Sequence, residues 1–159
     1  MAEGTPSEAG LYADARSGYD YLRDSVGIPP TRIVIYGHSL GSAVAVELAT
    51  QVPAAGLVVE GAFTSVPDRG AEIYPWLPVR LMTRNRFSSL DRIGSVHMPI
   101  LVIHGRDDST IPIAHGRRLF AAALEPKEFL EVAGGHDDAY SVGRAAYEEG
   151  FRRFLARLR

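Results

Sequence analysis

A serine stands between two glycines in the stretch GHSLG at residues 37–41, where an apolar run gives way to small residues at helical spacing. The apolar run at residues 32–36 predicts a buried strand, and residues 42–50 predict a helix. So tight a turn calls for glycine, because strand and helix pass close together and the backbone of Ser39 is strained. The helix start also leaves backbone N–H groups free, where they can stabilise an oxyanion. We therefore prefer a nucleophilic Ser39 to a serine that only caps the helix.

The composition narrows the class of protein. The 159 residues suffice for a single domain over residues 1–159, and 46% hydrophobic with 23% charged residues describe an ordinary globular protein. A formal net charge of −2 without a basic tract argues against nucleic acid or an anionic membrane as a partner. The absence of cysteine excludes disulfides, thiolate metal sites and a cysteine nucleophile. Without a signal-peptide pattern or an apolar run of ~20 residues, we expect a cytoplasmic protein.

Apolar runs and helical patterns alternate along the chain. An N-terminal helix is expected to begin with Thr5 as its cap, Pro6 in its first turn and Glu8 completing a capping box. Further helices are expected after Ser39, over residues 113–124 and at the C-terminus. Continuous apolar runs predict four strands buried on both faces, at residues 32–36, 57–63, 99–105 and 128–132. The alternation predicts an α/β fold of about four parallel strands with helices on both faces.

Residues 66–97 interrupt this alternation. Pro67, Pro75 and Pro78 break any long helix, and aromatic and apolar side chains are frequent in the segment. Two interpretations stay open, since these side chains suit either a plain core or a short cap-like segment that walls a binding pocket.

A serine hydroxyl becomes a good nucleophile when a base takes its proton, and a carboxylate must orient that base. In a parallel sheet, ligand-binding loops gather at the carboxyl ends of the strands. Two such loops follow the third and fourth predicted strands, HGRDDSTIP at residues 104–112 and AGGHDD at residues 133–138. Both are expected at the same edge of the sheet as Ser39. They bring Asp107 or Asp108, together with His136, toward the serine.

The order Ser, Asp, His resembles that of the α/β-hydrolase fold serine hydrolases, in the branch of esterases, lipases and serine aminopeptidases. The resemblance rests on G-H-S-L-G at 37–41, H-G-x-x-D-x-x-I-P at 104–112 and G-G-H at 134–136, and it spans nearly the whole chain. It implies Ser39 as nucleophile, Asp108 as acid, His136 as base and the backbone N–H of Leu40 as an oxyanion-hole donor. The spacing of the second motif favours Asp108 over Asp107.

The remaining polar residues near the motifs can have either a structural or a functional role. Asp137 and Asp138 are either turn residues or help to position His136. The other four histidines are expected to be structural: His38, His97, His104 and His115. Because they do not cluster in the sequence with further ligand types, we assign no metal, and we assign no cofactor either. Contacts to substrate are expected from four residues in or beside the motifs and the cap-like segment: His38, Phe63, Trp76 and Ile111.

The chain also departs from the family it resembles. A complete α/β hydrolase has several strands before the strand that leads to the nucleophile, whereas this chain begins just upstream of the preceding helix. The resemblance thus implies a truncated, minimal α/β-hydrolase fold without the loop that supplies a second oxyanion-hole N–H, a loss that typically costs ~10²–10³ in rate. The 32–36 strand would then have an open edge, and we expect a second copy to cover it in a homodimer or higher homo-oligomer.

The resemblance implies a carboxylic ester hydrolase that accepts short-chain or aryl esters with broad tolerance, its partner being a small-molecule ester. A thioesterase or an aminopeptidase is an alternative, because the same triad serves all three activities. A peptidase would need carboxylates for the free amino group of its substrate, and Glu60 and Glu72 are the candidates. The remaining alternative is a non-catalytic half-domain that binds a partner.

Overall fold

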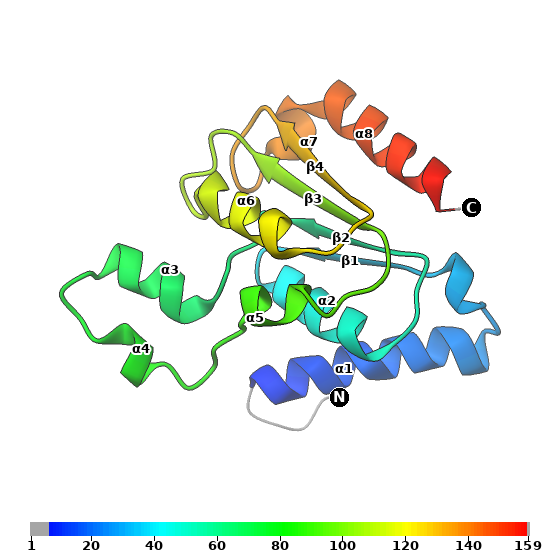
Figure 1. Cartoon of the computed structure of the whole chain (residues 1–159), viewed down its shortest axis with the longest axis horizontal. Helices are drawn as coiled ribbons and strands as arrows, with labels where there is room; N and C mark the ends of the chain where they lie inside the picture. The colour runs from blue at the N-terminus through cyan, green and yellow to red at the C-terminus, as the bar shows by residue number, and fades with distance from the viewer. Residues whose placement is uncertain (1–6, 159) are drawn as a thin grey trace.

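A single parallel sheet organises the chain in the computed structural model, which describes residues 7–158 (Figure 1). Its strand order follows the sequence, and each strand pairs in parallel with the next: β1 (Val34–His38), β2 (Gly56–Glu60), β3 (Ile100–Gly105) and β4 (Lys127–Val132). The four predicted strands are therefore confirmed, although β1 begins two residues later and β2 ends three residues earlier than the apolar runs do.

The two faces of the sheet bury different sets of side chains. Successive side chains of a strand point to opposite faces of the sheet. Every residue of β2 and β3 is buried, so both faces of the sheet are covered. Leu57 and Val59 pack with helices α1 (Glu8–Asp20), α2 (Leu40–Gln51) and α6 (Ile113–Ala122). Val58 and Leu101 pack on the other face against α8 (Arg144–Arg157), which follows the short helix α7 (Ala139–Val142). Figure 1 shows these two helical layers.

The N-terminal helix begins later than the sequence pattern suggests. Ser7 is its cap, with a side-chain oxygen that accepts a hydrogen bond from the N–H of Gly10, and Glu8 is its first residue. Thr5 and Pro6, the expected cap and first-turn residue, lie outside the described residues. After α1 the chain makes a wider turn, η1 (Tyr21–Ser25), and then η2 (Pro30–Arg32) leads into β1.

Glu8 does not complete a capping box but ties the helix to a distant segment. Its carboxylate accepts hydrogen bonds from the backbone N–H groups of Arg86 and Phe87 at 2.6 and 3.0 Å, and from the hydroxyl of Tyr12 at 2.7 Å. Phe87 has a φ of 44°, in the left-handed region that side chains other than glycine rarely adopt. The tether thus holds a strained turn in place between residues that are 79 apart in the sequence.

Residues 66–97 contain three short helices, α3 (Val66–Ile73), α4 (Val79–Met82) and α5 (Ser89–Ile93). Pro67 and Pro78 stand at the starts of α3 and α4, and α3 ends just before Pro75, so the prolines divide the segment as expected. Helix α5 returns to the body to pack against α2 and α6. By contrast, α3 and α4 pack against each other and project from the side toward which the strands point (Figure 1). We call residues 66–86 the α3–α4 lobe.

Strand β1 lies at one edge of the sheet, with β2 as its strand neighbour within residues 7–158. Ile33 and Ile35 are buried under the helices, whereas the side chain of Tyr36 is half exposed. The expectation that a second copy covers this edge stays a prediction. No helix among the described residues is long and apolar enough to cross a membrane.

The Glu8 tether makes a pH-dependent contribution to stability. Partial burial alone would raise the pKa of Glu8, but the hydrogen bonds from Tyr12, Phe87 and Arg86 outweigh it and hold the pKa below its ordinary value of 4.5. We expect Glu8→Gln to lower the free energy of unfolding by about 1–3 kcal/mol at pH 7, the range for hydrogen bonds to a charged group. Because the native pKa is depressed, this difference should be complete above pH 4.5 and shrink as the pH falls through the native pKa.

Urea denaturation of both proteins between pH 3 and pH 7, followed by circular dichroism, measures the effect. Glu149→Gln is the matched control, because Glu149 lies in an exposed ion pair with Arg152 on α8. A Glu8→Gln protein as stable as the parent at pH 7 would contradict the tether.

Candidate active site

Ser39 occupies the strained turn between β1 and α2. Its φ of 53° and ψ of −122° lie outside the regions that L-residues usually adopt. Its N–H donates to the carbonyl of Glu60 at 2.9 Å, which fixes the turn to the end of β2. A Cβ on Gly37 would lie deep inside van der Waals contact with the carbonyl of Gly41, so only glycine allows this approach of strand and helix.

Gly41 differs from the expectation for this motif. A Cβ at this position would meet no heavy atom of the described residues within 4 Å, and Gly41 lies inside the first turn of α2. Of the two glycines, only Gly37 is therefore required by the packing of the turn.

The three candidate catalytic side chains meet at the carboxyl edge of the sheet. Nε2 of His136 lies 2.8 Å from Oγ of Ser39, and Nδ1 of His136 lies 2.7 Å from Oδ2 of Asp108. Ser39 follows β1, Asp108 follows β3 and His136 follows β4, so three strand ends bring them together. Asp108 is buried and His136 is largely buried, which shields their contact from water.

Ile111 and His104 also contact the carboxylate of Asp108 and hold it in place. Its Oδ1 accepts the N–H of Ile111 at 2.7 Å, and Nε2 of His104 lies 3.5 Å from its Oδ2. His104 itself is fully buried and donates from Nε2 to the carbonyl of Ile111 at 2.8 Å. Its Nδ1 finds no hydrogen-bond partner among the described residues and faces Gly116, where a Cβ would approach it to 2.5 Å. The imidazole is therefore held as the Nε2–H tautomer beside the acid.

Two neighbouring aspartates, Asp107 and Asp138, make no hydrogen bond to the imidazole of His136 within residues 7–158 but support the loops of the site. Asp107 is exposed, and its N–H donates to the carbonyl of Gly134, which joins the two loops that carry Asp108 and His136. Asp138 accepts the N–H of Gly135 at 2.5 Å and so closes the turn that presents His136. Asp138 is thus a turn residue, one of its two expected roles.

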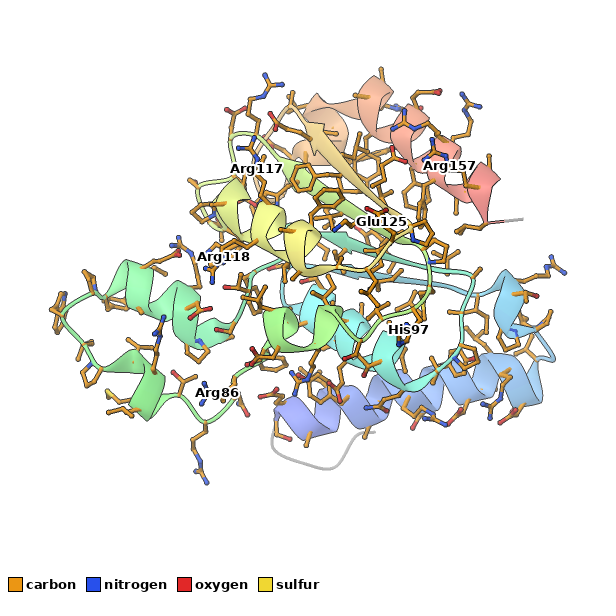
Figure 2. The ribbon with its side chains drawn as sticks, in the orientation of Figure 1. Arg86, His97, Arg117, Arg118, Glu125 and Arg157 are labelled. Atoms are coloured by element: carbon orange, nitrogen blue, oxygen red, sulfur yellow. The ribbon has the colours of Figure 1, made fainter. Side chains whose placement is uncertain are left out.

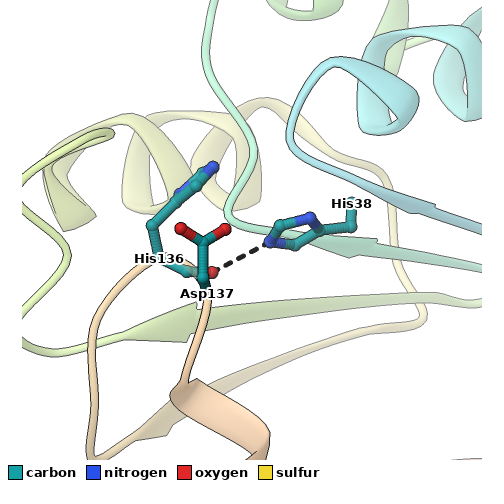
Figure 3. Close-up of side chains that lie close together, drawn as sticks. All are labelled: His38, His136 and Asp137. Atoms are coloured by element: carbon teal, nitrogen blue, oxygen red, sulfur yellow. Dashed lines mark hydrogen bonds between the residues drawn. The ribbon is translucent and has the colours of Figure 1, made fainter.

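His38 and Asp137 lie beside His136, the candidate base (Figure 3). Nε2 of His38 donates to the carbonyl of His136 at 3.0 Å, and the centres of the two rings are 4.9 Å apart. His38, His136 and Asp137 offer potential metal-ligand atoms within 4.8 Å of one another. In this arrangement, however, both ring nitrogens of His136 already bond to Ser39 and Asp108, so His38 supports the loop of the base rather than sharing a metal with it.

Leu40 is the first residue of α2, and its backbone N–H stands next to Ser39 at the positive end of the helix. No hydrogen bond from this N–H to a backbone acceptor is found among the helix-cap and loop contacts of residues 7–158. The arrangement leaves it available to an oxyanion formed on the serine side of the site.

The four expected substrate contacts fall in different surroundings. Phe63 and Ile111 are buried in one apolar cluster with Ala43 and Phe87. His38 lies beside the base, as described above. Trp76 is on the α3–α4 lobe with 76% of its surface exposed, and it does not belong to that cluster.

A buried carboxylate behind the turn was not singled out as structural from the sequence. Oε2 of Glu60 accepts the hydroxyl groups of Tyr36 at 2.5 Å and Tyr147 at 2.7 Å, and this links β1, β2 and α8. Burial and the bond to Glu60 raise the pKa of Tyr36 to about 12 and push that of Tyr147 higher still. The only sequence signal was a single glutamate within the apolar run at residues 57–63.

The lobe is also joined to the loop of the acid. The guanidinium of Arg69 on α3 donates to the carbonyls of Thr110 at 2.7 Å and Ser109 at 3.4 Å, and pairs with Glu72. Glu72 in turn lies 2.9 Å from Nε2 of the buried His115 on α6. Burial would raise the pKa of Glu72, but His115 and Arg69 lower it below its ordinary value.

Comparison with known proteins gives this arrangement a context. No family model matches the chain. An uncharacterized protein of Mycobacterium tuberculosis strain H37Rv is 46% identical over 153 residues, 96% of this chain and 54% of that protein. The human alpha/beta hydrolase domain-containing protein 17B is 32% identical over 156 residues, 98% of this chain and 52% of that protein. An esterase of Pyrococcus furiosus has a similar solved structure, with a TM-score of 0.78 at 19% identity over 98% of this chain and 65% of its own.

These comparisons confirm the predicted fold. The parallel sheet, its helices and the strand-end loops are those of an α/β-hydrolase fold with four strands. The chain spans about half the length of the curated relatives that it matches.

The two glycines of the serine turn should respond oppositely to alanine. Gly37→Ala forces a backbone clash and should lower the free energy of unfolding by about 3 kcal/mol or more. Gly41→Ala meets open space in a helix and should leave stability unchanged or raise it by up to about 1 kcal/mol. Urea denaturation of the two variants measures the difference, and equal stabilities would show that the close approach is not needed.

His104 should stay neutral at mildly acidic pH. Burial lowers its pKa below 6.5, and the carbonyl of Ile111 and the charge of Asp108 offset this only in part. Because the unfolded chain binds the proton more readily, this group should reduce stability as the pH falls below about 6.5. Nitrogen-15 NMR of the imidazoles, assigned through the signal missing in a His104→Asn protein, should show that the Nε2–H tautomer of His104 persists at a pH below 6.5. Titration at or above pH 6.5 would contradict this.

Proposed function

We propose that this chain, whose fold is that of the α/β hydrolases, carries the active site of a carboxylic ester hydrolase. The observation that supports the proposal is the continuous relay from Oγ of Ser39 through His136 to Asp108, with contacts of 2.8 and 2.7 Å. Packing alone has no use for this relay, because a strained serine, a largely buried imidazole and a buried carboxylate each cost folding free energy.

The first chemical step follows from the relay. Nε2 of His136 takes the proton of Ser39 while the serine oxygen attacks the carbonyl carbon of the ester. Asp108 holds Nδ1–H of the ring and stabilises the imidazolium that forms. The backbone N–H of Leu40 stabilises the oxyanion of the tetrahedral intermediate.

Collapse of that intermediate expels the alcohol, which takes the proton from His136 and leaves an acyl group on Ser39. His136 then removes a proton from water, and the resulting attack releases the carboxylic acid and restores the serine. In this scheme Ser39, His136, Asp108 and the N–H of Leu40 take part in the two steps, with one oxyanion-hole donor in place of two.

The surroundings of two glutamates favour an ester over a peptide with a free amino group. Oε2 of Glu60 accepts two tyrosine hydroxyls behind the serine turn, and Glu72 is paired with Arg69 and His115. Glu60 is therefore buried and already bonded, and Glu72 is already paired with two cationic or polar side chains, which disfavours both as sites for an ammonium group. The same three residues could also cleave a thioester. The Pyrococcus furiosus protein with the similar structure is described as an esterase, which favours the ester.

The test is labelling by a fluorophosphonate probe, together with hydrolysis of p-nitrophenyl acetate and butyrate. Ser39→Ala should abolish both labelling and turnover, because it removes the nucleophile. Asp108→Asn should lower kcat by about 10⁴, since the amide favours the wrong tautomer of His136.

Asp107→Asn is the matched control, because Asp107 is the exposed neighbour that makes no contact with His136 through its side chain among the described residues. Its activity should stay within a few-fold of the parent protein. Labelling and turnover that survive Ser39→Ala, or equal losses in the two aspartate variants, would refute the proposal.

A further inference from the structure

The α3–α4 lobe exposes an unusual amount of apolar surface. Leu81 is 88% exposed and Trp76 is 76% exposed, and three further large side chains of the lobe are at least about half exposed: Ile73, Tyr74 and Met82. Such side chains scattered singly need no explanation, but their concentration in one projecting segment marks an interaction surface. Gly70 and Val79 bring α3 and α4 into contact, so the lobe is a packed unit.

The charge of the lobe has the opposite sign to that of the chain. Residues 74–86 (YPWLPVRLMTRNR) contain Arg80, Arg84 and Arg86 and no acidic residue, and the whole lobe, with Asp68, Arg69 and Glu72, carries a formal charge of +2. The whole chain carries −2, so the residues outside the lobe carry −4. The cationic charge is therefore local, and composition alone does not reveal it.

Two of these arginines are available to a partner. Arg80 pairs with Asp68 at 3.0 Å, whereas Arg84 and Arg86 make no ion pair with a carboxylate within residues 7–158. Figure 2 shows the side chain of Arg86 extending away from the body of the molecule. The carboxylate of Glu8 accepts the backbone N–H groups of Arg86 and Phe87 rather than the guanidinium of Arg86.

We propose that the α3–α4 lobe docks on the surface of a lipid bilayer that contains anionic lipids. Trp76, Leu81 and Met82 would enter the interfacial region, while Arg84 and Arg86 contact lipid phosphates. Tryptophan and arginine beside aliphatic side chains suit this boundary, since one part of each side chain is apolar and the other is polar. The negative remainder of the chain is repelled by the same surface, so attraction acts at the lobe alone and fixes the orientation.

This orientation bears on the candidate active site. The lobe projects from the side toward which the strands point, where Ser39 and His136 lie, and Arg69 joins it to the carbonyls of Ser109 and Thr110 beside Asp108 (Figure 1). Docking would thus turn the carboxyl edge of the sheet toward the lipid. The inference goes beyond ester hydrolysis, and its test depends on binding rather than on turnover.

Trp76 is the only tryptophan of the chain, so it reports docking without a label. Its emission is recorded while phosphatidylcholine vesicles, or vesicles with 30% phosphatidylglycerol, are added to the protein. We expect a blue shift and quenching by brominated lipid with the anionic vesicles, both weakened by 0.5 M NaCl. Co-sedimentation with the same vesicles measures the partition coefficient.

The variants separate the two kinds of contact. Arg84→Gln with Arg86→Gln should lower the partition coefficient by about 25-fold, from about fivefold for each cation at an anionic surface. Leu81→Ser with Met82→Ser should lower it at least about tenfold. All four side chains are exposed, so circular dichroism should be unchanged. Arg32→Gln with Val26→Ser removes an exposed cation and an exposed apolar side chain outside the lobe, and should leave binding unchanged.

Several outcomes would overturn the proposal. They are an emission spectrum that anionic vesicles do not change, equal binding to neutral vesicles, and binding that the lobe variants leave intact. A blue shift that depends on protein concentration without lipid would assign the lobe to a second copy. A shift on reaction of Ser39 with a soluble fluorophosphonate would assign it to the substrate pocket. A protein that binds vesicles but hydrolyses no ester would refute the proposed function and leave the docking surface intact.

Discussion

The close approach of β1 and α2 at Gly37 governs the rest of the structure. Because no side chain fits between this residue and the carbonyl of Gly41, the chain can reverse within one residue and place Ser39 at the apex of the turn. The cost is a backbone conformation that serine rarely adopts, offset by the hydrogen bond from its N–H to Glu60 and by the buried helix behind it. The same geometry directs the first N–H groups of α2 to one side of the hydroxyl, so the strain, the proposed nucleophile and the proposed oxyanion donor arise from one turn.

The candidate site is supported by buried polar groups that each connect two or more elements. Glu60 ties β1, β2 and α8 behind the serine, His104 steadies the loop of Asp108, and His115 links α6 to the lobe through Glu72. Apolar packing fixes the register of a strand, but because it is not directional it allows a loop to shift slightly. Directional hydrogen bonds remove that freedom, which is what a relay with contacts below 3 Å requires.

Much of the site was predictable from residue order, and the failures have physical reasons. Parallel strands deliver their loops to one edge, so the residue order indicated Ser39, His136 and one of the aspartates 107 and 108. The resemblance to the α/β hydrolases favoured Asp108. Phe63 and Ile111 were expected near the site, and they lie in one apolar cluster, whereas Trp76 lies on the lobe. The roles of Glu8 and Glu60 depend on partners 79 and 87 residues away, and no local pattern encodes such a pairing. Gly41 looked required only because the motif contains it.

The sequence by itself determined the alternation of strands and helices, the parallel sheet and the edge at which the polar loops meet. These features follow from hydrophobic periodicity and chain connectivity, both of which are properties of neighbouring residues. Only the tertiary structure decided which aspartate faces the imidazole, which histidines support loops and which apolar side chains stay in water. Those outcomes depend on distances between segments far apart in the chain, where a shift of one ångström makes or breaks a hydrogen bond.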